Sequence, residues 1–226
     1  MYDKKIIVSD DGSHTIELIG QNEQYHSTHG AIQESNHVYI THGLERKVIQ
    51  NKELHILEVG MGTGLNVFLS WFYAKKHQLK IVYHAIEAYP ISQDLWSQLN
   101  YSQSIDHGSA KEVFSKIHSS PWGQEIALDD QFILIKKEEP IQSSILPEAT
   151  FDVVYYDAFN PDLEPDLWTE QVFRKIYHSM KECSILSTYS TKGVIKRAMK
   201  ECGFKIEKKP GPPGKREILN AIKGII

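Results

Sequence analysis

The feature that most constrains this chain is an apolar run that leads directly into three glycines at alternate positions. Residues 55–59 have the composition of a buried strand, Gly60, Gly62 and Gly64 follow, and a helical pattern begins at Leu65. A strand, a tight turn and a helix N-terminus in this order form the place where an open α/β sheet holds a nucleotide-like ligand. The sequence therefore predicts a ligand site at this turn.

The spacing of the glycines distinguishes two classes of ligand. A dinucleotide fingerprint needs G-x-G-x-x-G, and Leu65 stands where its last glycine should be. Glu58, two residues before Gly60, would repel a pyrophosphate but can accept hydrogen bonds from an ammonium group. S-adenosylmethionine (SAM) carries an ammonium group and no phosphate. We interpret the turn as a SAM site, with a glycine-rich turn that only packs the strand on the helix as the alternative.

Two further acids are expected to contact the adenosine part of SAM. Glu87 ends an apolar run, 80–87, roughly twenty residues past the glycines, where a ribose presents its two hydroxyls. Glu138 follows the next predicted strand, 132–135, and is the candidate for the adenine, with Glu139 beside it. The complete predicted SAM-binding set is Glu58, Gly60, Met61, Gly62, Thr63, Gly64, Asn66, Glu87 and Glu138.

Strand and helix patterns alternate along the rest of the chain, which predicts a doubly wound, Rossmann-like α/β sheet. Residues 5–19 have the pattern of a β-hairpin. Residues 25–40, polar and aromatic at first, are typical of a surface segment, with a lid over a pocket as the alternative. We therefore predict an N-terminal hairpin and lid extension over residues 1–50 and a SAM-dependent methyltransferase domain over 51–226.

Composition limits the setting of the protein. The chain has 226 residues, 41% of them hydrophobic, with no apolar run of about 18 residues that could span a membrane. The start of the chain does not have the pattern of a signal peptide. Cys183 and Cys202 lack C-x-x-C spacing and are expected to be free thiols in a reducing environment. We therefore expect a cytoplasmic location without a membrane. From Lys181 onward, eleven Lys or Arg stand against four Glu, whereas the first 180 residues hold 14 basic and 25 acidic residues. The basic end is compatible with phosphate contacts or with a solvated surface.

Asp157 is the candidate catalytic residue. It directly follows the apolar run 151–156, so in this fold it would lie at the same edge of the sheet as the glycine turn. SAM carries an electrophilic methyl group, and an amine that attacks it must first lose a proton, which a carboxylate can accept. Phe159, Trp168 and Tyr189 could wall such a site and contact a cation. A helix-capping or turn carboxylate is the alternative for Asp157.

Several blocks of this sequence together resemble the MnmC-like methyltransferases. The blocks are residues 58–66, residues 157–161 with 165–169, and residues 214–219, which contain G-K-R-E. Residues 26–35 match the stand-alone members (MnmD), which lack the FAD-dependent oxidase half of the bifunctional enzyme MnmC.

The resemblance implies methylation of the amine of 5-aminomethyl-2-thiouridine at the tRNA wobble position, giving 5-methylaminomethyl-2-thiouridine. It implies that Asp157 faces the amine, that another enzyme supplies this amine, and that the basic C-terminal part contacts the anticodon arm. We expect no metal. The predicted substrate-binding residues are His26, Ser27, Glu34, Phe159, Pro161, Trp168, Tyr189, Lys215 and Arg216. The alternatives are a methyltransferase for a small-molecule amine, a non-catalytic SAM-fold partner protein and, more remotely, a nicotinamide oxidoreductase.

Overall fold

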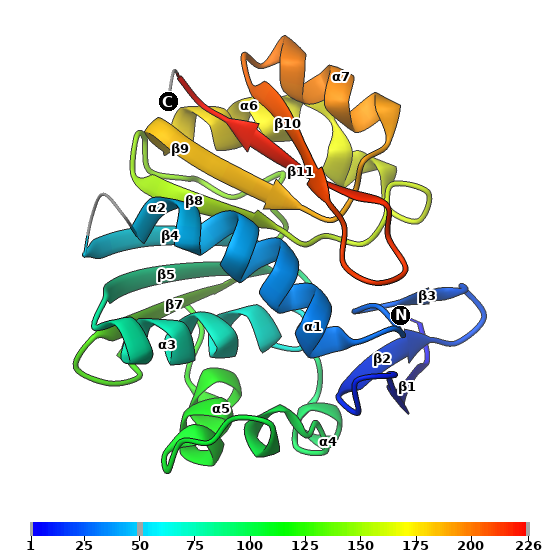
Figure 1. Ribbon diagram of the computed structural model, residues 1–226, viewed down its shortest axis with the longest axis vertical. Coiled ribbons are helices and arrows are strands. Elements are labelled where there is room, and N and C mark those ends of the chain that lie inside the picture. Colours follow the sequence, from blue (N-terminus) through cyan, green and yellow to red (C-terminus); the bar gives the residue numbers. More distant parts are fainter. Residues whose placement is uncertain (1, 49–51, 225–226) are drawn as a thin grey trace.

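A computed structural model describes residues 2–48 and 52–224 and contains two sheets (Figure 1). The larger sheet has eight strands in the order β10-β11-β9-β8-β4-β5-β7-β6. Five of them run parallel, and β6, β10 and β11 run antiparallel to their neighbours. The strands are β4 (Glu53–Val59), β5 (Lys80–Glu87), β6 (Glu125–Ala127), β7 (Phe132–Glu138), β8 (Phe151–Tyr156), β9 (Met180–Thr188), β10 (Lys205–Pro210) and β11 (Glu217–Ile222).

The order of the strands reverses between β4 and β8. From β4 the chain proceeds to β5 and β7 on one side, and from β8 it proceeds to β9 on the other. The two strands pair in parallel with Val59 opposite Tyr156, so both end at the same edge of the sheet. Ligands of doubly wound sheets bind at this switch point. The predicted fold class is confirmed.

Alternate residues of the central strands supply two separate hydrophobic cores. On β8, Val153 and Tyr155 face one core, and Val154 and Tyr156 face the other. All residues of β8 are buried, as expected for a parallel strand that is covered on both faces. Helices α3 (Leu65–His77) and α5 (Ala110–Ser119) pack on one face, and α6 (Glu170–Ser179) and α7 (Gly193–Glu201) on the other (Figure 1). Short helices complete the set: α4 (Gln93–Trp96), η2 (Tyr101–Gln103) and η3 (Pro165–Trp168).

The N-terminal part forms the small sheet and a continuous helical run. The small sheet contains β1 (Lys4–Val8) and β2 (His14–Leu18), which form the predicted hairpin, and β3 (Glu23–Gln24). The helical run consists of α1 (Ala31–Ser35), the π-helix η1 (Asn36–Leu44) and α2 (Glu45–Val48).

The interpretation of residues 25–40 as a surface segment was wrong. Val38, Tyr39 and Ile40 are almost completely buried, and they pack in the same core as α3 and β8. The apolar residues in the second half of this segment lie on the side that faces the large sheet, which explains its burial. The division of the chain at residue 50 stays a prediction.

Residues 2–48 and 52–224 contain neither a candidate membrane span nor a cluster of metal ligands. No helix in these ranges is long and apolar enough to cross a bilayer. No group of three or more His, Cys, Asp or Glu side chains there is arranged to hold a metal ion.

Candidate active site

The glycine turn joins the end of β4 to the start of α3, as the sequence predicts. Gly60, Gly62 and Gly64 all have positive φ, at 88°, 49° and 71°. Position 60 also requires glycine for a steric reason, because a Cβ there would lie 2.5 Å from the backbone oxygen of Asp157. Glycine therefore lets the turn lie directly against the chain that leaves β8.

A cavity of about 990 Å³ opens at this edge of the sheet. The glycine turn and the residues that follow β5, β7 and β8 line it, together with residues 23–29 of the N-terminal part and the loop between β10 and β11. Its position matches the switch point of the strands. A large cavity therefore lies where the fold predicts a ligand.

Asp157 lies in the wall of this cavity with both carboxylate oxygens held. The Tyr39 hydroxyl donates to Oδ1 at 2.6 Å, and the Asn66 amide donates to Oδ2 at 2.8 Å. Burial raises the pKa of Asp157 to about 7, although these two hydrogen bonds oppose the rise. A carboxyl group with this pKa is partly ionised near neutral pH and can accept a proton.

Glu58 lies behind Asn66, outside the cavity. Its Oε1 accepts a second hydrogen bond from the Asn66 amide at 2.9 Å, so one amide group bridges two acids. Glu58 is completely buried, and its burial raises its pKa well above the usual range. Asn66 therefore occupies Oε1 of Glu58, and the expected contact between Glu58 and an ammonium group stays a prediction.

Glu87 lines the cavity and also organises the glycine turn. Its Oε2 accepts from the backbone N–H of Gly62 at 2.9 Å, and its Oε1 accepts from the N–H of Tyr89 at 2.8 Å. Each oxygen retains a second lone pair for a further donor. A diol placed against this carboxylate would find acceptors beside the turn.

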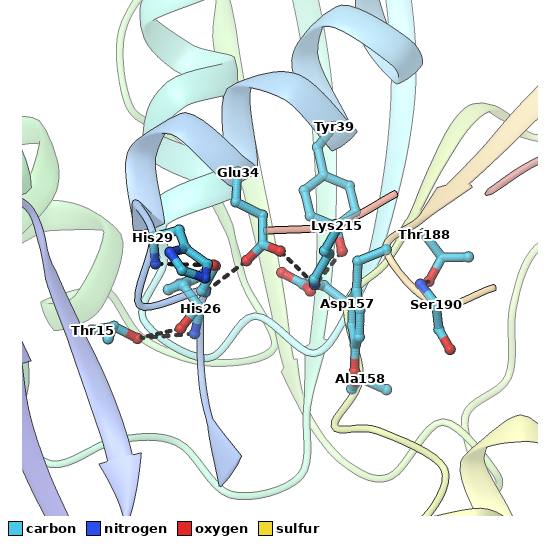
Figure 2. Close-up of polar contacts among 12 residues, drawn as sticks. Thr15, His26, His29, Glu34, Tyr39, Asp157, Ala158, Thr188, Ser190 and Lys215 are labelled. Atoms are coloured by element: carbon cyan, nitrogen blue, oxygen red, sulfur yellow. Dashed lines mark hydrogen bonds and ion pairs between the residues drawn. The ribbon is translucent and has the colours of Figure 1, made fainter. Parts of the chain in front are cut away.

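The Glu34–Lys215 ion pair closes one side of the cavity, and we call it the latch. The two charged groups are 2.5 Å apart, and the Lys215 ammonium also lies 4.2 Å from the centre of the Tyr189 ring. Glu34 is fixed in turn by the N–H of Ser27, at 2.7 Å. Figure 2 shows Glu34, Tyr39 and Lys215 converging beside Asp157. The latch joins the N-terminal part to the loop between β10 and β11.

His26 joins the N-terminal part to the glycine turn. Its Nε2 is 2.6 Å from the Thr63 hydroxyl, and its backbone N–H donates to the Thr15 hydroxyl oxygen at 2.9 Å. Burial lowers the pKa of His26 to about 4, so the ring is neutral near pH 7. This histidine therefore contributes hydrogen bonding rather than charge to the cavity.

The structure brings most of the predicted site residues together. Those that line the cavity are Asp157, Gly60, Met61, Gly62, Thr63, Glu87, His26, Ser27, Glu34, Phe159, Tyr189, Lys215 and Arg216. Those outside its lining are Glu58, Gly64, Asn66, Glu138, Pro161 and Trp168.

Physical reasons account for two of the residues outside the lining. The indole of Trp168 donates to the backbone oxygen of Phe159 at 2.7 Å and packs against Tyr156, so it supports the wall from behind. Glu138 is exposed at the end of β7, and its neighbour Glu139 lines the cavity instead.

Sequence reasoning missed Tyr39 and Tyr25. Tyr39 contacts Asp157, and Tyr25 lines the cavity with its ring edge-on to Phe159, at 4.9 Å between centres. The polar and aromatic composition of residues 25–40 was the available signal, but it does not specify which aromatic residue faces an acid.

Comparisons with known proteins agree with this geometry. A family described as "S-adenosyl-L-methionine-dependent methyltransferase" matches residues 119–224. The bifunctional protein MnmC of tRNA 5-methylaminomethyl-2-thiouridine biosynthesis from Burkholderia multivorans is 29% identical, over 93% of this chain and 33% of its own length. The protein of that name from Pseudomonas entomophila is 28% identical, over 89% of this chain and 32% of its own length. The chain spans about a third of these relatives.

Two solved structures share the fold. MnmC2 from Aquifex aeolicus superimposes with a TM-score of 0.80 at 21% identity, covering 98% of this chain and 70% of that one. Spermidine synthase from Thermotoga maritima gives a TM-score of 0.58 at 13% identity, covering 100% of this chain and 71% of that one.

The fold and the glycine turn resemble those of Rossmann-like SAM-dependent methyltransferases, and the family match over residues 119–224 supports SAM as the predicted cofactor. The predicted resemblance to the MnmC-like methyltransferases is also confirmed, because MnmC relatives match nearly the whole chain.

Proposed function

We propose that this chain transfers a methyl group from SAM to the amine of 5-aminomethyl-(2-thio)uridine at the tRNA wobble position. The observation that carries the proposal is Asp157, a carboxyl group with a pKa of about 7 at the switch point of the sheet, directly against the glycine turn. An amine nucleophile needs a proton acceptor at this place, whereas a binding module does not.

The residues around the turn fit SAM. Gly60 and Gly62, both at positive φ, line the cavity with main chain and no side chain. Glu87 offers acceptors to the ribose. Ile141 and Gln142 line the cavity beside Glu139 and would border the adenine. When bound, SAM supplies the electrophilic methyl group on its sulfonium.

The remaining wall fits a protonated amine. Asp157 and Glu34 would attract its positive charge, and Phe159 and Tyr189 supply aromatic faces that favour a cation. Asp157 would then accept a proton from the ammonium, which leaves the nitrogen lone pair free to attack. Holding the amine in line with the methyl group is mainly a proximity effect.

The charged surface near the cavity supports an RNA substrate. Arg197 and Lys200 of helix α7 are exposed, as is Lys192 directly before it, and Arg216 lines the cavity from the loop between β10 and β11. Such residues would contact backbone phosphates and position the anticodon arm, while the flipped wobble base enters the cavity. The MnmC relatives carry a name that specifies this nucleoside.

Nucleoside analysis of tRNA tests the proposal. Cells without this protein, complemented with the wild-type chain, should contain 5-methylaminomethyl-uridine, and cells with Asp157→Asn should accumulate the aminomethyl precursor. SAM affinity of the purified variant is the control, because the variant must still bind SAM. Identical tRNA in all strains would contradict the proposal.

A small-molecule amine is a second candidate, favoured by the charge of the cavity. Nine Asp or Glu residues and three Lys or Arg residues are among the described residues that line it. Such a wall suits a small cation that has no phosphates. The salt dependence of substrate binding separates the two candidates, since several phosphate contacts cause a steep loss of affinity with added salt.

A further inference from the structure

We propose that Tyr39 is a positioning residue for Asp157: its hydroxyl, placed by a π-helix, fixes the carboxylate and keeps it ionised for the incoming amine. This inference rests on the proposed function, because it assigns Asp157 the role of proton acceptor.

The contact is short and shielded from solvent. The Tyr39 hydroxyl donates to Oδ1 of Asp157 at 2.6 Å, and Tyr39 is only 1% exposed. Asn66 holds the other oxygen at 2.8 Å. Two donors on different oxygens prevent rotation of the carboxylate, and each oxygen keeps a second lone pair for the amine.

The helix that carries Tyr39 is unusual. Residues Asn36–Leu44 form a π-helix of nine residues, and the N–H of Glu45 bonds the oxygen of Ile40, five residues earlier. π-helical turns are rare and are found frequently at functional sites. Here the π-helix packs on β8 and β9, and Tyr39 lies near its middle, with its ring against Tyr155. A regular α-helix would place the following side chains at different angles around the axis.

The charges around Asp157 explain why a donor is needed there. Burial, and after it Glu34 on α1, raises the pKa of Asp157, and Lys215 on the loop between β10 and β11 lowers it. The acid Glu58 on β4 and the hydroxyls of Tyr83 on β5 and Tyr189 after β9 also face this group.

Tyr39 itself remains a donor at neutral pH. Burial and the neighbouring Asp157 raise the pKa of its hydroxyl well above the usual range. The protonated hydroxyl favours the ionised form of Asp157, and its removal leaves the carboxyl group with fewer interactions that stabilise a charge.

The test compares Tyr39→Phe with Tyr155→Phe, a matched control. Tyr155 is also completely buried and touches the Tyr39 ring, but its hydroxyl pairs with Ser70, at 3.2 Å. The first readout is a carbon-13 titration of the Asp157 carboxyl group in the SAM-bound protein, which needs no turnover. The second is the pH profile of kcat with tRNA that carries the aminomethyl group.

We expect Tyr39→Phe to move the Asp157 titration and the rising limb of kcat to higher pH by about one unit, and to lower kcat at pH 7 about fivefold with SAM affinity unchanged. Tyr155→Phe should leave both midpoints in place. Equal midpoints in Tyr39→Phe and the wild type would overturn the inference. A shifted titration without methyl transfer by any form of the protein would instead refute the proposed function.

A second substitution keeps the inference testable if Tyr39→Phe does not fold. 3-Fluorotyrosine introduced at position 39 keeps the hydroxyl and makes it a stronger donor. We expect it to move the Asp157 titration to lower pH, and an unchanged or higher midpoint would overturn the inference.

Discussion

The latch between Glu34 and Lys215 should contribute measurably to stability, and Glu34→Gln tests this. The pair joins residues 181 positions apart, and its side chains are 9% and 31% exposed. Glutamine has nearly the same shape and can still accept the hydrogen bond from the N–H of Ser27. The substitution therefore removes the charge and little else.

The magnitude follows from the burial of the two groups. Removal of one partner of a fully buried pair costs about 3–5 kcal/mol, because the other charge stays buried without compensation. Lys215 is almost one-third exposed, so solvent screens its charge, and we expect a loss of about 1–2 kcal/mol. For a chain of this size, that loss corresponds to a decrease of about 2–8 °C in Tm.

The assay is thermal unfolding of four proteins: wild type, Glu34→Gln, Lys215→Met and the double variant. A coupling energy of about 1–2 kcal/mol between the two substitutions would show that the partners stabilise each other. Glu170→Gln, which breaks the exposed pair with Arg174 on α6, is the matched control and should leave Tm unchanged. A Glu34→Gln variant as stable as this control, or a coupling energy near zero, would refute the reasoning.

Three further predictions concern the acids and the turn. Gly60→Ala should lower the free energy of unfolding by at least about 1–2 kcal/mol, because an L residue is strained at positive φ, and it should also weaken SAM binding. Urea unfolding measures the first effect and calorimetry the second. Wild-type values for both would contradict the close approach of the turn to β8. Glu87→Gln should raise the Kd for SAM about tenfold, because it removes the negative charge from the acceptors that Glu87 offers to the ribose, while an unchanged Kd would exclude Glu87 from SAM binding. The pKa of Asp157 is higher in the folded chain than in the unfolded chain, so the contribution of Asp157 to stability falls as pH rises from about 4 to about 7. The difference in Tm between pH 5 and pH 8 should therefore be smaller in Asp157→Asn than in the wild type. An equal difference in both proteins would show that Asp157 does not titrate in this range.

The sequence allowed the fold and the centre of the site to be predicted because local patterns determine both. Three apolar runs identify parallel strands, and they lead into Gly60, Glu87 and Asp157. The last residues of parallel strands in a doubly wound sheet lie at one edge of the sheet. The three segments consequently line one cavity, although more than ninety residues separate the first from the last.

Side-chain direction could not be predicted in the same way. A strand that is buried on both faces has no alternation of apolar and polar residues, so the sequence does not indicate that Glu58 lies outside the lining of the cavity. Tyr39 was missed because the pattern of a helix with 3.6 residues per turn does not describe a π-helix. The partners Glu34 and Lys215 are distant in the chain, and no local signal relates them.

The central claim is that this chain methylates a tRNA amine with Asp157 as proton acceptor. The most direct measurement supplies the purified protein with SAM labelled in its methyl group and with tRNA that carries 5-aminomethyl-2-thiouridine, and then identifies the labelled nucleoside. We predict that the label appears in 5-methylaminomethyl-2-thiouridine with the wild-type chain, and that Asp157→Asn, which still binds SAM, transfers little of it. The account would be contradicted by unlabelled tRNA, by label in another nucleoside, or by full activity in the Asp157→Asn variant.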